Sequence, residues 1–267
     1  MIKEWNIFLT GLMFLTRIPV PKNIDYSGEL LQKSAKYFPA IGWVVAAVSF
    51  TGFFIFHKYV AENIGLLALM ITGIFTTGAF HEKGFADTCD AFGGGWTKEK
   101  ILLIMKDSRA GTYGVSGLAL ILAAKFLLLK ELLAAFSFSS TSEWQLYFNF
   151  FVALMAAHAV SRLMSVLVIQ SYQYVTADDG SKSKPLVSKK LPVGELNVAI
   201  LYALFPFLFL PYHFLLSLVF IVPATFLLGN YFKKWIGGYT GDCLGAVQQV
   251  TEIIFYLSVF MIWKYIS

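Results

Sequence analysis

The sequence predicts an all-α protein that crosses a membrane about seven times, and its composition, apolar runs and charge placement support this. Hydrophobic residues make up 57% of the 267 residues, whereas charged residues make up only 14%. A soluble domain carries roughly 25% charged residues, so lipid is expected to surround most of this chain. We expect a single integral membrane domain that extends over residues 1–267.

Apolar runs give the expected helices. A membrane-spanning helix needs about 20 mostly apolar residues. The runs that reach or approach this length are residues 37–56, 64–80, 115–136, 147–169, 197–210, 214–229 and 250–266. The fifth and sixth runs are short and meet at Pro211, which predicts a helical hairpin. Residues 4–16 are expected to form a short helix at the membrane interface, before Arg17 and Pro19 interrupt the apolar run.

Basic residues alternate with the expected spans. Outside those spans, every Lys and Arg except Lys58 falls in residues 1–36, 81–114, 170–196 or 230–249. Basic loops stay on the cytoplasmic side of a membrane, so we expect the N-terminus and these four segments in the cytoplasm of a bacterial inner membrane. The same scattered placement argues against a nucleic-acid partner, although the net charge is +5. Cys89 and Cys243 fall on the cytoplasmic side and are expected to be reduced.

A polar, Gly-rich segment, residues 81–114, carries the chemistry. Asp87 and Asp90 are three residues apart, so on a helix they would share a face and could hold Mg²⁺ together with waters and substrate phosphates. Lys106 and Arg109 have the same spacing and suit phosphate binding, and glycines 93–95 let backbone N–H groups approach an anion. The segment therefore predicts a metal-dependent phosphoryl-transfer site in a cytoplasmic loop. The plain alternative is an interfacial loop whose charges face water.

Three other features favour the site over this alternative. Lys125 and Arg162 lie inside expected spans, where charge is expensive and marks a cavity or a functional partner, although Lys125 could extend to the interface instead. Residues 233–246 repeat the same chemistry, and Asp242 could complete a metal or base site. A Gly-rich turn is the alternative there. Arg17 precedes Pro19 and Pro21 in a rigid segment beside the membrane, where it is either a substrate contact or a topology charge.

The motifs also resemble those of a known family. They are FLTRIPVP at residues 14–21, FPAIG at 38–42, HEKGFADTCDAF at 81–92, IMKDSRAGTYGV at 104–115, SR at 161–162 and KKWIGGYTGDCLGA at 233–246. In this order they resemble the motifs of the cobalamin synthase family. Its members, also called adenosylcobinamide-GDP ribazoletransferases, are membrane enzymes of late vitamin B12 synthesis. The chain departs from the family pattern at Lys83, where Asp is common, and at Ala91, where Gly is common.

The resemblance implies the reaction. A hydroxyl of α-ribazole, or of α-ribazole 5′-phosphate, attacks adenosylcobinamide-GDP. GMP leaves, and adenosylcobalamin or its 5′-phosphate forms with Mg²⁺ as cofactor. Membrane lipids are the other expected partners, and the sequence leaves open whether copies assemble into a homo-oligomer.

Roles follow for the candidate residues. The core metal ligands are expected to be Asp87 and Asp90, with Glu82 and Asp107 as further candidates, and Lys83 is left out of the metal set. Lys106 and Arg109 are expected to act on the phosphates in catalysis, and the base is His81 or Asp242. The substrate-binding candidates are Arg17, Lys125, Arg162, Lys234 and Thr240.

Two other functions would explain part of this pattern. A CDP-alcohol-type phosphotransferase would use similar chemistry, but such enzymes carry a further Asp shortly after the position of Asp90, and here Ala-Phe-Gly-Gly-Gly follows. A transporter of a phosphorylated or corrinoid ligand would explain the charges within spans. No internal repeat pairs the two halves of this sequence.

Overall fold

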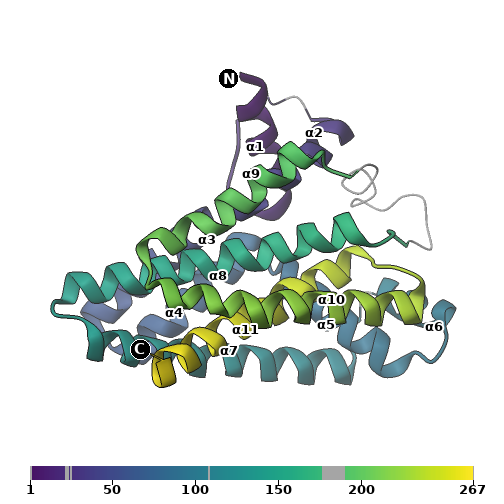
Figure 1. Cartoon of the computed structure of the whole chain (residues 1–267). Coiled ribbons are helices and arrows are strands. Elements are labelled where there is room, and N and C mark those ends of the chain that lie inside the picture. Colours follow the sequence, from purple (N-terminus) through teal and green to yellow (C-terminus); the bar gives the residue numbers. More distant parts are fainter. Residues whose placement is uncertain (1, 22–23, 25, 108, 176–189, 267) are drawn as a thin grey trace.

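The computed structural model describes residues 2–21, 24, 26–107, 109–175 and 190–266 (Figure 1). Its helices are α1 (Ile2–Leu15), α2 (Gly28–Ser34), η1 (Ala35–Tyr37), α3 (Phe38–Tyr59), α4 (Glu62–Thr77), α5 (Phe80–Gly94), α6 (Lys98–Lys106), α7 (Thr112–Ser139), α8 (Glu143–Ser171), α9 (Val193–Leu204), η3 (Phe205–Phe209), η4 (Tyr212–Leu216), α10 (Ser217–Ile236) and α11 (Gly241–Ile266). Besides these helices, the described residues contain one isolated β-bridge, between Tyr174 and Tyr239. The predicted all-α class is confirmed.

The number of spans differs from the expectation of about seven. Four helical stretches are long and apolar enough to cross a membrane, namely Gly28–Tyr59, Glu143–Ser171, Tyr212–Ile236 and Gly241–Ile266. A fifth is the pair α4 and α5, if that bent pair counts as one span. The expected span 197–210 falls in a shorter apolar helix, Val193–Phe209, and 115–136 falls in the 28-residue helix α7, which is not among the four. The chain is a multi-pass membrane protein with four or five such stretches.

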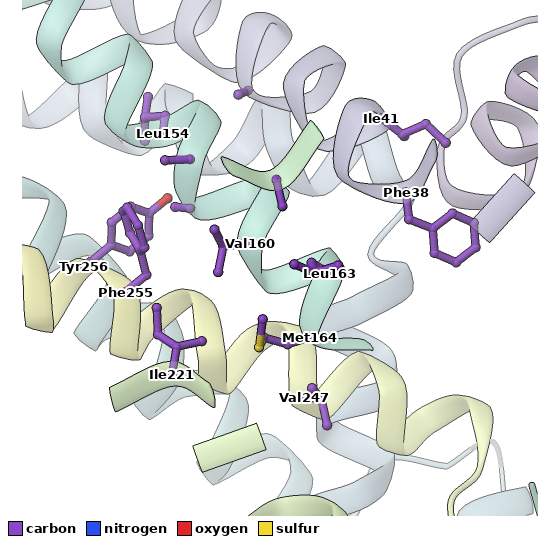
Figure 2. Packing of buried hydrophobic residues seen from close by; sticks show 14 of the residues in the cluster. Phe38, Ile41, Leu154, Val160, Leu163, Met164, Ile221, Val247, Phe255 and Tyr256 are labelled. Atoms are coloured by element: carbon purple, nitrogen blue, oxygen red, sulfur yellow. The ribbon is translucent and has the colours of Figure 1, made fainter. Parts of the chain in front are cut away.

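Helix α8 lies at the centre of the bundle. It packs against α3 on one side and α11 on another, and 89% of its most apolar window is buried inside the protein. Figure 2 shows Val160, Leu163 and Met164 of α8 lying toward α11, which carries Val247. Because α8 is sheltered from lipid by its neighbours, it can carry polar side chains such as Arg162 at membrane depth.

The chain bends sharply between α4 and α5. The two helices meet at 87°, because Gly78 and Ala79 both adopt left-handed backbone conformations, with φ of 63° and 55°. Glycine adopts this conformation freely, whereas Ala79 is strained there. The bend directs the start of α5 into the protein, so that His81 and Glu82 are buried.

The motif-bearing segments gather at one end of the bundle. The α5–α6 and α10–α11 turns lie at this end, and the α7–α8 turn and the C-terminus lie at the other (Figure 1). Residues 81–114, expected to be a loop, instead form α5, α6 and the start of α7. Lys22, Lys182, Lys184 and Lys189, which contributed to the expected charge pattern, lie outside the described residues.

Candidate functional site

Two glycines set the centre of the site. A Cβ built on Gly84 of α5 would lie 2.9 Å from the Asp242 carbonyl oxygen and 3.2 Å from the Gly245 Cα. A Cβ on Gly245 of α11 would likewise lie 3.1 Å from the Gly84 Cα. Small residues at a helix crossing let the two backbones touch, and a side chain at either position would push them apart.

This contact brings two carboxylates to the same side of the helix crossing. Asp87 follows Gly84 by three residues, and Asp242 precedes Gly245 by three, so in this antiparallel pair the two residues share one side of the crossing. Asp242 lies near enough to Asp87 and Lys83 for both charges to act on it. Lys83 itself forms an ion pair with Asp87 and is mostly exposed, with 61% of its side chain accessible. We refer to Asp87 and Asp242 as the carboxylate pair.

On the inner side of the same crossing lies a buried polar cluster. Glu252 is 1% exposed and forms an ion pair with Lys125, at 2.7 Å between Nζ and Oε1. Gln248 Nε2 donates to Glu252 Oε2 at 2.6 Å, and the Tyr256 hydroxyl donates to Oε1 at 3.0 Å. Lys125 is therefore held inside the protein by Glu252, and does not extend to the membrane interface.

Arg162 and Glu82 complete this cluster. Arg162 Nη1 donates to the His158 carbonyl oxygen at 2.9 Å, and Gln249 Nε2 donates to Glu82 Oε1 at 3.1 Å. Among the described residues, Arg162 Nε, His158 Nε2 and Glu82 Oε2 have no hydrogen-bond partner. All three residues line a cavity with ≈ 20 Å³ open to the centres of water molecules, which is room for one or two waters. The cavity has the donors and acceptors to hold such a water.

Asp90 faces a different partner from Asp87. Its two carboxylate oxygens accept hydrogen bonds from the backbone N–H groups of Gly111, at 2.7 Å, and Gly114, at 2.8 Å. These N–H groups lie at the N-cap and in the first turn of α7, where donors have no partner within the helix and the helix dipole favours a negative charge. Asp90 thus joins α5 to the start of α7.

Asp107 is paired with Arg109. Arg109 Nη2 lies 2.6 Å from Asp107 Oδ2, and Arg109 Nε lies 3.0 Å from Oδ1. Hydrogen bonds from the Arg109 side chain and backbone lower the pKa of Asp107 to about 2. Asp107 is ionised at neutral pH, and its charge partly neutralises that of Arg109.

The remaining candidates lie around the same end. Thr240 is buried, and its hydroxyl accepts from the Cys243 N–H at 3.3 Å, so it caps the start of α11. Arg17 packs over Gly78 at the α4–α5 bend, where a Cβ on Gly78 would lie 2.9 Å from the Arg17 Cγ. Lys106 and Lys234 are exposed at the ends of α6 and α10.

The four predicted metal ligands are not gathered around one point. Within the described ranges, no group of three or more His, Cys, Asp or Glu side chains is arranged to hold a metal ion. Asp90 is engaged with α7, Asp107 with Arg109, and Glu82 with Gln249. The carboxylate pair fits a different arrangement, because Mg²⁺ is commonly held by one or two carboxylates together with waters and substrate phosphates.

Several residues of this site have no expected role from the sequence. Gln248, Glu252 and Tyr256 repeat at a spacing of four on α11, which puts them on one helix face. Polar side chains at that spacing inside an apolar helix are the signal that could have identified them. His158 also belongs to this site, because it contacts Arg162 and lies 3.9 Å from Glu252.

Comparison with known proteins assigns the family. The model of the family described as cobalamin-5-phosphate synthase matches residues 7–260. The chain belongs to this family. An adenosylcobinamide-GDP ribazoletransferase of Leptospira interrogans is 41% identical over 98% of this chain and 97% of its own length. Proteins of the same name from Shewanella frigidimarina and Shewanella piezotolerans are each 39% identical over 96% of this chain, and over 94% and 95% of their own lengths. No solved structure matches the chain.

In this member of the cobalamin-5-phosphate synthase family, the motifs that carried the resemblance lie around the site. Residues 81–92 form most of α5, 104–115 join α6 to α7, and 233–246 join α10 to α11. The motif at 38–42 starts α3, where a Cβ on Gly42 would lie 2.6 Å from the His158 carbonyl oxygen. Motifs far apart in the sequence therefore meet around the carboxylate pair and the buried polar cluster.

Proposed function

We propose that this chain is a membrane-bound adenosylcobinamide-GDP ribazoletransferase. The chain would join adenosylcobinamide-GDP to α-ribazole, or α-ribazole 5′-phosphate, and release GMP. One observation carries the proposal: the Gly84–Gly245 contact brings Asp87 and Asp242 together, at the end of the bundle where the family motifs meet. The end-to-end identity to relatives of that name supports it.

The carboxylate pair is proposed to hold Mg²⁺. When bound there, Mg²⁺ would neutralise charge on the pyrophosphate of the donor. Asp87 and Asp242 come from two different helices, so the site depends on the helix crossing. Lys83 adds a positive charge beside both carboxylates, and we propose that it turns to the donor phosphates when the pair is occupied. The proposed phosphate contacts also include four basic residues that are exposed at the same end, namely Arg17, Lys106, Arg109 and Lys234.

The chain's own groups would then move the proton. A ribose hydroxyl of the acceptor attacks the phosphorus atom attached to the corrinoid, and the bond from that phosphorus to GMP breaks. We propose His81 as the base that accepts the hydroxyl proton, because it is buried at the Gly84–Gly245 crossing and lines two cavities. We propose that the chain lies in a bacterial inner membrane and that this end of the bundle, where the basic residues gather, faces the cytoplasm.

GMP release tests the function. Purified protein in lipid vesicles is given adenosylcobinamide-GDP, α-ribazole and Mg²⁺, and GMP and the cobalamin product are measured by chromatography. We expect both products in equal amounts, no turnover with chelator, and a loss of about 100-fold or more in kcat for Asp87→Asn. Substrate crossing the vesicle membrane without GMP release would instead support a transporter.

A further inference from the structure

The cavity within the buried polar cluster collects polar atoms that no protein group satisfies. We call it the inner cavity, and its walls include Ser49 of α3, Glu82 of α5, and His158 and Arg162 of α8. All four side chains are buried, and each leaves one polar atom without a hydrogen-bond partner among the described residues, namely Ser49 Oγ, Glu82 Oε2, His158 Nε2 and Arg162 Nε. Four of the nine such atoms in the described ranges therefore belong to residues around one small cavity.

The hydrogen-bond roles of these atoms follow from their neighbours. Arg162 Nη1 lies 3.2 Å from His158 Nδ1. A guanidinium group can only donate, so Nδ1 is the acceptor and the imidazole carries its proton on Nε2. Arg162 Nε and His158 Nε2 are therefore both donors, whereas the Glu82 carboxylate oxygen accepts and the Ser49 hydroxyl can take either role. The unpartnered set consists of two N–H donors and two oxygens.

The charges around the inner cavity favour a neutral ligand. Lys125 and Arg162 line it, and so do Glu82 and Glu252. A cation would lie against the N–H donors of Arg162 and His158, and an anion would lie against carboxylates. The space admits one or two water molecules. A single water accepts two hydrogen bonds and donates two, which is the number that two N–H groups and two oxygens require.

One oxygen of Glu82 is already linked to α8 through protein groups. Gln249 Nε2 donates to Glu82 Oε1 at 3.1 Å and to Gln248 Oε1 at 2.9 Å. Gln248 Nε2 in turn donates to the Ser161 hydroxyl at 3.1 Å. This chain of side chains runs from α5 across α11 to α8, and it leaves Glu82 Oε2 as the end without a partner in the described part of the protein.

We propose that an ordered water occupies the inner cavity, where it accepts from Arg162 and His158 and donates to Glu82 and Ser49. The water gives α5 a second polar link to α8 and a link to α3. This matters because α5 itself packs mainly against α11 and α7. Glu82 directly follows His81, so the water helps to hold the proposed base in position. Only this last role rests on the proposed function.

A crystal structure of the full chain, grown in a lipid phase, tests the water directly. At about 2 Å resolution, where other buried waters are visible, we expect a density peak in the inner cavity at about 2.7–3.2 Å from Arg162 Nε. A map that resolves other buried waters but shows no density at this place would overturn the proposal.

Removing one hydroxyl tests the water by a change of sign. If the Ser49 hydroxyl bonds to a bound water, Ser49→Ala should raise the equilibrium constant for unfolding about threefold to tenfold in a detergent titration. Ser217→Ala is the matched control, because Ser217 is equally buried and its hydroxyl also lacks a partner among the described residues, but it does not line the inner cavity. Its loss should leave the constant unchanged or lower it, since an unsatisfied buried hydroxyl is unfavourable. A Ser49→Ala protein as stable as wild type would contradict the proposal.

The role in holding His81 is tested by kinetics. Ser49→Ala should lower the kcat for GMP release about tenfold and leave both KM values within about twofold, because the water orients the base and touches neither substrate. Ser217→Ala should change none of these values. An unchanged kcat, or a raised KM, in Ser49→Ala would overturn the positioning role. If the wild-type protein releases no GMP, the proposed function fails, whereas the density and the unfolding titration still decide whether the water is bound.

Discussion

Glu252 is expected to be the residue on which the interior of the protein depends most. It accepts hydrogen bonds from Gln248 and Tyr256 and pairs with Lys125, all at positions away from solvent. Glu252→Gln keeps the shape of the side chain and removes its charge. The change leaves the Lys125 ammonium, at 9% side-chain exposure, without its counter-ion.

The expected loss is large. Removing one partner of a buried ion pair costs about 3–5 kcal/mol, because the other charge stays buried and uncompensated. Lys125→Met should cost less, roughly 1–3 kcal/mol, because Glu252 keeps its bonds from Gln248 and Tyr256. The double variant Lys125→Met/Glu252→Gln removes both charges and should be more stable than Glu252→Gln alone by about 2 kcal/mol.

Unfolding in mixed micelles measures these differences. The four proteins are titrated with denaturing detergent and followed by tryptophan fluorescence, with Lys130→Met as the control. Lys130 lies on the same helix as Lys125 but is exposed, so its loss should change stability by less than about 0.5 kcal/mol. A Glu252→Gln variant that loses less than about 1 kcal/mol, or losses that add in the double variant, would refute the reasoning.

Three further predictions concern the helices around the carboxylate pair. Gly84→Ala should destabilise the protein by about 1–3 kcal/mol, since its Cβ meets the α11 backbone. In contrast, Gly194→Ala, with nothing within 4 Å, should be neutral or slightly stabilising in the same unfolding titration. Asp90→Asn should lower stability by about 1–2 kcal/mol, because an amide cannot accept from both Gly111 and Gly114, whereas Asp87→Asn should lower activity with little effect on stability. Since the folded-state pKa of Asp107 is depressed to about 2 from an ordinary 3.8, its contribution to stability is present above the ordinary value and is lost as the pH falls toward 2. Because Asp107 is ionised throughout the neutral range, Asp107→Asn should leave the pH dependence of activity near neutrality unchanged. A pH–activity profile whose acidic side shifts in this variant would contradict the depressed pKa of Asp107.

The spacing of Asp87 and Asp90 does not indicate which helix each residue contacts. Asp87 and Asp90 lie on a helix as their spacing implied, but Asp87 lies beside α11 whereas Asp90 binds α7. Side chains three apart on a helix point in directions that differ by about 60°, enough to face different neighbours. Which neighbour each faces depends on tertiary packing, which the spacing alone does not carry.

The glycines of residues 93–95 show the same limit. Their clustering suggested a loop that holds an anion, yet α5 continues through Gly94. A Cβ on Gly93 would lie 2.6 Å from the Tyr113 ring, and one on Gly95 would lie 2.6 Å from Ile101. These two glycines make room for α7 and α6. A glycine required for close packing and one required by an anion look alike in a sequence.

Charge at membrane depth was the more reliable signal. Lys125 and Arg162 were singled out because charge is expensive inside a span, and both line the buried cavity. Glu252, the counter-ion of Lys125, has no role in the interpretation of the sequence. The positions of the charges could be predicted, whereas the pairing depended on how α7, α8 and α11 pack together.

The central claim is that Asp87 and Asp242 act as one unit from two helices. The most direct test measures Mg²⁺-dependent GMP release by wild-type protein, Asp87→Asn, Asp242→Asn and the double variant over a range of Mg²⁺ concentrations. We expect each single variant to raise the Mg²⁺ concentration needed for half-maximal activity and to lower kcat about 100-fold or more. The double variant should be little worse than either single variant, because groups that act together are not additive. Activity near wild type in either single variant, or losses that multiply in the double variant, would contradict the claim.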